Sequence, residues 1–173
     1  MSKSVELRRH TDSDGDVLSA EGVAAALKIG QRLRGGNVLA VSSGAQRATQ
    51  TVACFLAGLG EQVRDGVVVD SRFRSNVEDR WRAAFERAGA GDIDSFRSVD
   101  PELVDSEGRV LGNALEDVFG RLSDGERALV VGHSPMQEVA VFGLTGQVVD
   151  PLGKGAGVVV TETDGEYSVE ALD

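Results

Sequence analysis

The chain contains only two histidines, His10 and His133, and each stands at the end of an apolar run. His10 follows the run that begins at Val5, and His133 follows the run that begins at Ala128. A neutral imidazole can act as a nucleophile near pH 7, so the pair could carry covalent chemistry. Residues so distant in the chain meet only if their strands lie side by side. The sequence therefore predicts that these two strands are neighbours.

Two arginines extend this pair. Arg9 directly precedes His10, and Arg47 follows another apolar run that ends in Ser42-Ser43. Ligands of open α/β sheets lie beyond the carboxyl ends of the strands, so we expect these side chains to converge there. Arginine binds phosphate oxygens bidentately and helix N-termini add N–H donors, which together suit a tetrahedral dianion. His10 is the candidate nucleophile because it adjoins Arg9, and His133 and both arginines would stabilise the transferring phosphoryl group.

The elements that must position these residues follow from the apolar pattern. Short continuous apolar runs alternate with stretches of helical spacing, and Ser19 is placed to cap the first helix. This alternation predicts an α/β fold, a three-layer α/β/α sandwich with a mostly parallel central sheet, as a single domain over 1–173. The predicted strands are 4–10, 38–41, 67–69 and 128–131; the predicted helices are 20–34, one from 42–44 to about 59, and 134–144; strands 157–161 and 167–171 form a closing hairpin.

Residues 71–127 are less regular, and we expect them to decorate the carboxyl edge of the sheet. Within them, 77–88 has the pattern of an amphipathic helix, on which Glu78 could pair with Arg82 four positions later. The apolar face of this helix is predicted to consist of Trp81, Ala84, Phe85 and Ala88. The other features expected here are a polar tract over 94–112, a turn at Asp100-Pro101 and a helix around 115–122.

Further residues beside the histidines and the strand ends are candidate substrate contacts: Thr11, Ser43, Ser134, Arg72 and Arg74. Ser43 could alternatively cap the helix that follows it, and no Gly-x-Ser-x-Gly elbow surrounds it. The stretch 153–157 has the glycines and the lysine of a phosphate-binding loop. Because neither a Ser/Thr nor a helix follows it, we predict no such role for it.

Composition limits the classes of partner. The formal net charge of −10 argues against general affinity for nucleic acid or an anionic membrane, which both require clustered Lys and Arg. The start of the chain lacks an apolar signal region, and no apolar run approaches the ~18 residues of a membrane span. We therefore expect a cytoplasmic protein that binds neither nucleic acid nor membrane. The oligomeric state is not predicted.

Three segments carry a resemblance to the histidine phosphatase superfamily, the family with the phosphoglycerate-mutase-like fold. They match its signatures in order and spacing, and Leu18 to Gly22 resembles the start of its first helix. The resemblance implies that His10 accepts the phosphoryl group, that Arg9, Arg47 and His133 form the phosphate pocket, and that no metal or other cofactor is needed. Within the superfamily, the short chain is most similar to the small bacterial phosphohistidine phosphatases. The segments are Leu7-Arg8-Arg9-His10-Thr11, Ser42 to Thr51, and Val131-Gly132-His133-Ser134-Pro135.

The sequence departs from the family pattern at two points. Arg8 replaces an apolar strand residue, which would suit a strand exposed on that side. The Leu-x-Glu that supplies a general acid in mutases and many sugar phosphatases is missing after 67–69, and Glu78 is the nearest carboxylate and the possible proton donor. An alkoxide leaving group needs a proton, whereas imidazole leaves far more readily. The departure therefore favours phosphohistidine or an activated ester as substrate.

These observations predict a metal-independent phosphatase that works through a phosphohistidine intermediate on His10. Its expected substrate is phosphohistidine in a protein or a small phosphate ester. Two alternatives stay open: a phosphomutase of the phosphoglycerate type, which the missing Leu-x-Glu disfavours, and a non-catalytic phosphate-binding or interaction module on the same fold. Net release of inorganic phosphate distinguishes a phosphatase from both a mutase and a non-catalytic module.

Overall fold

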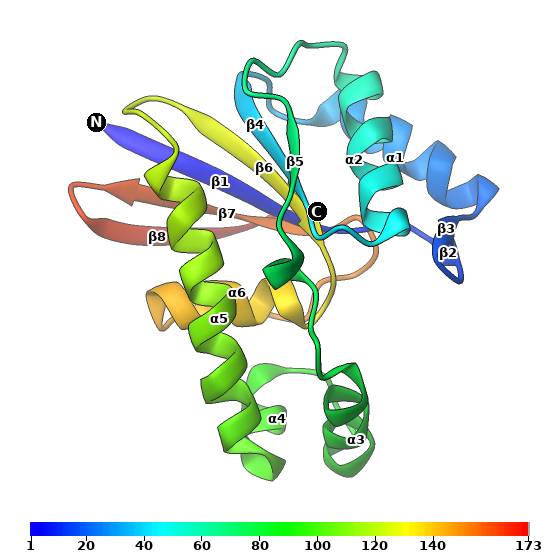
Figure 1. Ribbon diagram of the computed structural model, residues 1–173, viewed down its shortest axis with the longest axis vertical. Helices are drawn as coiled ribbons and strands as arrows, with labels where there is room; N and C mark the ends of the chain where they lie inside the picture. The colour runs from blue at the N-terminus through cyan, green and yellow to red at the C-terminus, as the bar shows by residue number, and fades with distance from the viewer. Residues whose placement is uncertain (173) are drawn as a thin grey trace.

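The computed structural model describes residues 1–172 and contains a six-stranded sheet with the order β5-β4-β6-β1-β7-β8 (Figure 1). The first four of these strands run parallel, and β7 and β8 are antiparallel to their neighbours. The predicted mostly parallel sheet is confirmed. The strands are β1 (Ser2–Arg9), β4 (Asn37–Ser42), β5 (Val67–Val69), β6 (Arg127–Gly132), β7 (Gly157–Thr163) and β8 (Glu166–Leu172).

Helices cover both faces of the sheet and complete the three layers. Helices α1 (Ala20–Arg32) and α2 (Gln46–Leu59) lie on one face, and α5 (Pro101–Gly120) and α6 (Met136–Thr145) lie on the other (Figure 1). Each face encloses its own apolar core, as expected for strands that are buried on both sides. Ser19 caps α1 as predicted, and its hydroxyl accepts the N–H of Gly22 at 3.0 Å.

Strands β1 and β6 are direct neighbours, as the positions of the two histidines require. Arg9 lies opposite Gly132 at the end of the parallel ladder. The N–H of His10 then donates to the carbonyl of Gly132 at 2.9 Å. Both histidines therefore leave the sheet at the same edge.

The segment 71–127 contains more helix than the sequence pattern indicated. It forms a short 3-10 turn η1 (Ser71–Phe73), α3 (Glu78–Ala88), α4 (Ile93–Val99) and then α5. The predicted polar tract over 94–112 is wrong: Asp92 caps α4 and Asp100 caps α5, with Pro101 in its first turn. The buried residues of α5 lie along one side of the helix. The many polar residues between them hide this helical pattern in the sequence. The buried residues that reach the core include Leu103, Leu111, Leu115 and Phe119.

Helices α5 and α6 approach closely because both carry glycine at their contact. A Cβ on Gly143 would lie 2.0 Å from the carbonyl oxygen of Gly108, so no larger residue fits. Since α5 also contacts β1, this part of the segment 71–127 belongs to the layers of the fold. Helices α3 and α4 lie beyond α5 and α6, away from α1 and α2 (Figure 1).

Two local predictions about charged residues are wrong. Arg8 is 7% exposed rather than on an exposed strand side, because its guanidinium donates to Glu6 at 2.6 Å and to the carbonyl of Gly155 at 2.8 Å. Glu78 pairs with Arg74 at 3.2 Å. Arg82, its predicted partner, pairs instead with Asp79. Arg8 has partners inside the protein, and Glu78, at the start of α3, pairs with a residue that precedes the helix.

A small hairpin follows His10, where the sequence showed no periodicity. It consists of β2 (Ser13–Asp14) and β3 (Val17–Leu18), and Gly15 provides the positive φ of its turn. At the other end of the chain, the predicted hairpin of β7 and β8 is confirmed, with Asp164 and Gly165 in the left-handed region. Within residues 1–172, no helix has the length and apolar character needed to cross a bilayer.

Candidate active site

His10 lies directly after β1, with 7% of its surface exposed. Its Nδ1 lies 2.7 Å from the carbonyl oxygen of Thr11. A carbonyl can only accept, so Nδ1 carries the ring hydrogen and donates it. Nε2 is therefore the nitrogen with the free lone pair. In this tautomer His10 has the form that a nucleophile needs.

His133 lies directly after β6, and its ring packs edge to face against that of His10 with centroids 5.3 Å apart. A guanidinium can only donate, so Nη2 of Arg47, 3.4 Å from Nδ1 of His133, selects the tautomer with hydrogen on Nε2. That nitrogen lies 2.8 Å from the hydroxyl of Ser43. Arg47 and Ser43 together fix the ring of His133.

Ser43 does not cap α2, contrary to one of its two interpretations. The residue in the N-cap position is Ala45, which has no side-chain oxygen for the purpose. Ser43 is 1% exposed and bonded to His133, so its position at the end of β4 serves the ring instead. The strand order explains the contact, since β4 is the other neighbour of β6.

Arg9 is held by the loop between α6 and β7. Its Nη1 donates to the carbonyl of Leu152 at 3.0 Å, and its backbone N–H donates to the carbonyl of Ala156 at 3.0 Å. Its Nε is buried without a hydrogen-bond partner among the described residues. A buried donor of this kind fits an anionic group that approaches the guanidinium.

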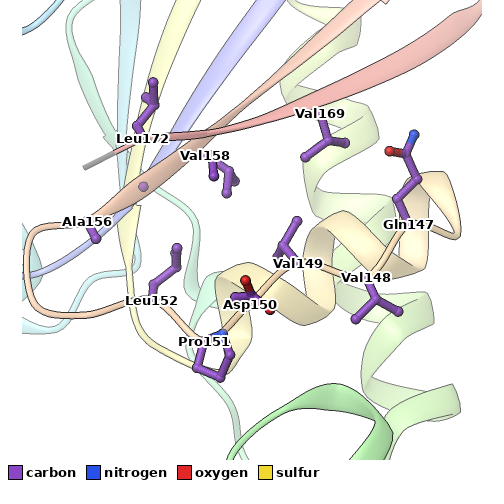
Figure 2. A pocket seen from close by; sticks show the side chains of 12 residues that line it. Gln147, Val148, Val149, Asp150, Pro151, Leu152, Ala156, Val158, Val169 and Leu172 are labelled. Carbon is purple, nitrogen blue, oxygen red and sulfur yellow. The ribbon is translucent and has the colours of Figure 1, made fainter.

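The same loop also lines a separate cavity of about 350 Å³, between α6 and the hairpin of β7 and β8 (Figure 2). Its walls include the apolar side chains Val149, Leu152, Val158 and Leu172 as well as Gln147 and Asp150. Neither histidine, Arg9 nor Arg47 lines this cavity, so the reaction chemistry lies elsewhere. The cavity touches the site only through the loop that holds Arg9.

Burial and positive charge keep both histidines neutral. Desolvation is the largest cause that lowers the pKa of His10, and Arg47, Arg9 and Lys154 lower it further, although the Thr11 carbonyl opposes them. Desolvation also leads for His133, and together with Arg47 and other nearby cations it lowers the pKa to about 3. Two neutral imidazoles among cations can bind an anion and leave an imidazole lone pair available.

The remaining candidates for substrate contact separate into two groups. Arg74 lies close enough to His133 to lower the pKa of that histidine. Arg74 also forms an ion pair with Glu78, the possible proton donor. Arg72 is instead bound by Asp70 at 2.7 Å and by Asp117 at 2.8 Å. The structure therefore brings Arg74 towards the histidines and commits Arg72 to a carboxylate pair.

Thr11 and Ser134 are adjacent to the histidines but are engaged with the protein. The hydroxyl of Thr11 donates to the carbonyl of Gly22 at 2.8 Å, and its N–H donates to Thr51 at 3.3 Å. The hydroxyl of Ser134 donates to Glu138. Thr11 thus ties the end of β1 to α1 and α2, and Ser134 ties the site to the buried face of α6.

Several residues of the site were missed at the sequence level. Lys154 lies close enough to His10 to lower its pKa, and it pairs with Asp12. Asp16, from the turn of the small hairpin, pairs with Arg47 at 2.8 Å. The glycines around Lys154 are a signal in the sequence, although neither a Ser/Thr nor a helix follows them. Asp16 gave no signal beyond the acidic character of its loop.

Two polar residues of α6 were also missed. Gln137 is fully buried, and its amide donates to the carbonyls of Arg8 at 3.0 Å and Val130 at 3.3 Å, so it links β1 to β6 beneath the site. Glu138 is 1% exposed, and desolvation raises the pKa of its carboxyl to about 7 despite the Ser134 hydrogen bond. Their signal was a pair of polar residues within an apolar helix.

The arrangement is one of donors for an anion rather than ligands for a cation. Among residues 1–172, no group of three or more His, Cys, Asp and Glu side chains is arranged to hold a metal ion. The groups nearest the histidine rings include Arg9, Arg47 and Lys154, and the carboxylates of Asp12 and Asp16 are paired with two of these cations. The excess of donors suits a phosphate group.

The family comparison agrees with this geometry. The family model of the histidine phosphatase superfamily, branch 1, matches residues 2–149. The chain belongs to this superfamily. No curated protein sequence matches the chain.

Solved structures of the superfamily fold match over nearly the whole chain. A phosphoserine phosphatase from Entamoeba histolytica, in complex with 3-phosphoglyceric acid, matches with a TM-score of 0.75 and 14% identity, covering 99% of this chain and 97% of the other. A phosphoglycerate mutase from Bacillus anthracis matches with 0.69 and 18%, covering 99% and 92%. The putative phosphohistidine phosphatase SixA from Agrobacterium tumefaciens matches with 0.57 and 17%, covering 98% and 97%. At these identities the matches establish the fold, which phosphatases and mutases share.

Proposed function

We propose that this histidine phosphatase superfamily member is a phosphatase that uses His10 as its nucleophile. Nε2 of His10 attacks phosphorus, the bond from phosphorus to the leaving group breaks, and the leaving group takes a proton from solvent. Water then attacks the phosphohistidine, the P–N bond breaks, and the proton that this water loses returns to solvent as inorganic phosphate and neutral His10 are released. Each half-reaction balances without a metal or another cofactor.

One observation carries this proposal: the two neutral histidine rings lie 5.3 Å apart at one sheet edge, and Nε2 of His10 has no hydrogen of its own. A nucleophile with a pKa below its ordinary value is unprotonated at neutral pH. The second ring, fixed by Arg47 and Ser43, lies beside the atom that would receive the phosphoryl group.

Three groups would stabilise the charge of the transferring phosphoryl group. The guanidinium groups of Arg9 and Arg47 offer donors in the fork geometry that matches phosphate oxygens. His133 offers its Nε2–H, which it shares between Ser43 and a phosphoryl oxygen. The protein already holds the residues that carry these donors near the histidines, and Arg47 has to release Asp16 before it binds phosphate fully.

The proposed substrates are phosphohistidine in a protein and small phosphate monoesters. Glu78 is exposed and bonded to Arg74, so it is a poor source of a proton for a strongly basic alkoxide. A leaving group of low basicity, such as imidazole or an activated alcohol, reduces the need for that proton. This reasoning also disfavours a mutase, which must return the phosphoryl group to an ordinary alcohol.

The test is phosphate release from an aryl phosphate in the presence of a chelator, by the wild type and by His10→Ala. We expect release by the wild type alone, with a similar melting temperature for both proteins. Quenching during turnover should trap an acid-labile, base-stable phosphoryl group on the wild type. Equal release by His10→Ala would overturn the mechanism.

The same preparation separates the alternatives. Interconversion of phosphoglycerate isomers without net phosphate release would establish a mutase. Binding of vanadate with neither release nor interconversion on any substrate would establish a non-catalytic module.

A further inference from the structure

A cavity of about 310 Å³ opens beside Arg9 and Ser134, the neighbours of the two histidines in the sequence. Its remaining walls come from α3, α4 and the loops on either side of α6. They are apolar and include Phe85, Phe96, Pro135 and Leu152. Neither histidine lines the cavity, which adjoins the histidines through Arg9 and Ser134. Arg9 is the cationic residue of the lining, and the phenylalanines and prolines form its apolar end.

Phe85 shows that the apolar end is accessible. Its side chain was expected to pack with Trp81 and Ala84 on the buried face of α3, but Phe85 is 52% exposed while the other two are buried. A ligand in the cavity would remove part of this ring from water, which is favourable for an apolar group. Phe96 gives the cavity a fixed wall, since it is 2% exposed and packs edge to face on Trp81.

The charge of the walls limits what can bind. Arg9 is the only charged residue among the described residues that line the cavity. When its guanidinium holds the phosphoryl group, a second charge on the organic part would lie against phenylalanine and proline without a partner. Removal of such a charge from water is costly, so charged leaving groups are disfavoured.

We propose that this cavity binds the leaving group, and that the enzyme prefers phosphorylated compounds whose organic part is uncharged and apolar or aromatic. The inference rests on the proposed phosphatase function. The volume of about 310 Å³ is roughly twice that of a cavity that holds benzene, so a single ring or a six-carbon chain fits. Phosphoglycerate and free phosphoserine, with their carboxylates, fall outside this class, whereas the neutral ring of a phosphohistidine side chain falls within it.

The test compares hexyl phosphate with 5-carboxypentyl phosphate in the wild type. Both esters release a strongly basic alkoxide, so both should react slowly and a high enzyme concentration is needed. They have primary alcohols of similar acidity and differ at the far end of a chain of similar length, so the ratio of their rates reports the binding of that end. We expect kcat/KM to be at least about tenfold higher for hexyl phosphate, the effect of a few apolar contacts. Ethyl phosphate, which is too short to reach the apolar end, should also react at least about tenfold more slowly than hexyl phosphate.

Phe85→Ala tests whether the preference for an apolar leaving group arises from this cavity. It should reduce the ratio of kcat/KM for hexyl over ethyl phosphate by roughly tenfold. Val110→Ala is the matched control, since Val110 is 43% exposed on α5 and lies outside the cavity. It should retain the wild-type ratio.

The outcomes distinguish this proposal from the function on which it rests. Release that depends on His10 but shows no preference for hexyl over 5-carboxypentyl phosphate would overturn the leaving-group site alone. A preference that Phe85→Ala leaves intact would also overturn it, because the apolar contact would then lie elsewhere. Absence of His10-dependent release from every ester, including aryl phosphate, would overturn the phosphatase function and this inference with it.

Discussion

His10 and His133 follow paired positions on adjacent parallel strands, and their rings meet edge to face with centroids 5.3 Å apart. The hydrogen of each ring has a defined acceptor: Nδ1–H of His10 donates to the Thr11 carbonyl, and Nε2–H of His133 donates to Ser43. The backbone and two side chains thus fix both tautomers before any substrate arrives. Preorganisation of this kind lowers the cost of reaching the transition state.

The titration of the two rings is the first prediction. Because burial and then neighbouring cations lower both pKa values, NMR titration should place the midpoint of His10 below 6.5 and that of His133 near 3. A lowered histidine pKa means that protonation favours the unfolded chain. Stability should therefore fall as the pH drops from 6.5 towards these lower values. A midpoint for His10 at or above 6.5 would contradict the assignment.

Ser43 should be a positioning residue for His133. Ser43→Ala removes the acceptor of the Nε2–H and leaves that donor buried, so kcat should fall by roughly tenfold while KM changes little. Ser42→Ala is the control, since its hydroxyl bonds Thr49 at 2.7 Å at the same strand end. That variant should lose a similar amount of stability, about 1 kcal/mol, and keep its kcat. Equal kinetic losses in the two variants would indicate a general effect on the strand end.

The arrangement of the strands could be predicted because candidate residues follow each strand directly in the sequence. The strand-end placement of His10 and His133 required adjacent strands, and the order β4-β6-β1 confirms this. The α/β/α layers followed from short apolar runs that alternate with helices. What could not be predicted depends on contacts between distant segments, such as the hydrogen bond between Ser43 and His133.

Electrostatic partners were the least predictable part. Local spacing suggested that Glu78 pairs with Arg82, but Glu78 begins α3 and reaches back to Arg74. Asp16 gave no sign of reaching Arg47, because that contact depends on the fold of a hairpin with two-residue strands. Phe85 matched the apolar face of its helix, yet the structure turns it towards a cavity. Periodicity identifies an element, but it does not identify what the element faces.

Asp16 should compete with substrate for Arg47. The pair is 2.8 Å long, and Asp16 is half exposed, so a phosphate group would have to displace its carboxylate. Asp16→Asn should lower KM for a phosphate ester by roughly two- to fivefold with little change in kcat, the scale of an exposed ion pair. Asp14→Asn makes the same change of charge in the same hairpin and is the control. If both variants lowered KM equally, the cause would be net charge rather than competition.

Glu138 should make stability depend on pH. Desolvation raises the pKa of this carboxyl from 4.5 to about 7, so the folded protein retains a proton that the unfolded chain releases. The free energy of unfolding should therefore decrease as the pH rises from 4.5 to 7, by up to about 3 kcal/mol from this group. Glu138→Gln cannot ionise and still offers an oxygen to Ser134, so it should remove that component. Glu170→Gln, at an exposed position on β8, should leave the profile of the wild type. Chemical denaturation at pH 5 and pH 8 measures the difference, and an unchanged difference in Glu138→Gln would show that its carboxyl ionises normally.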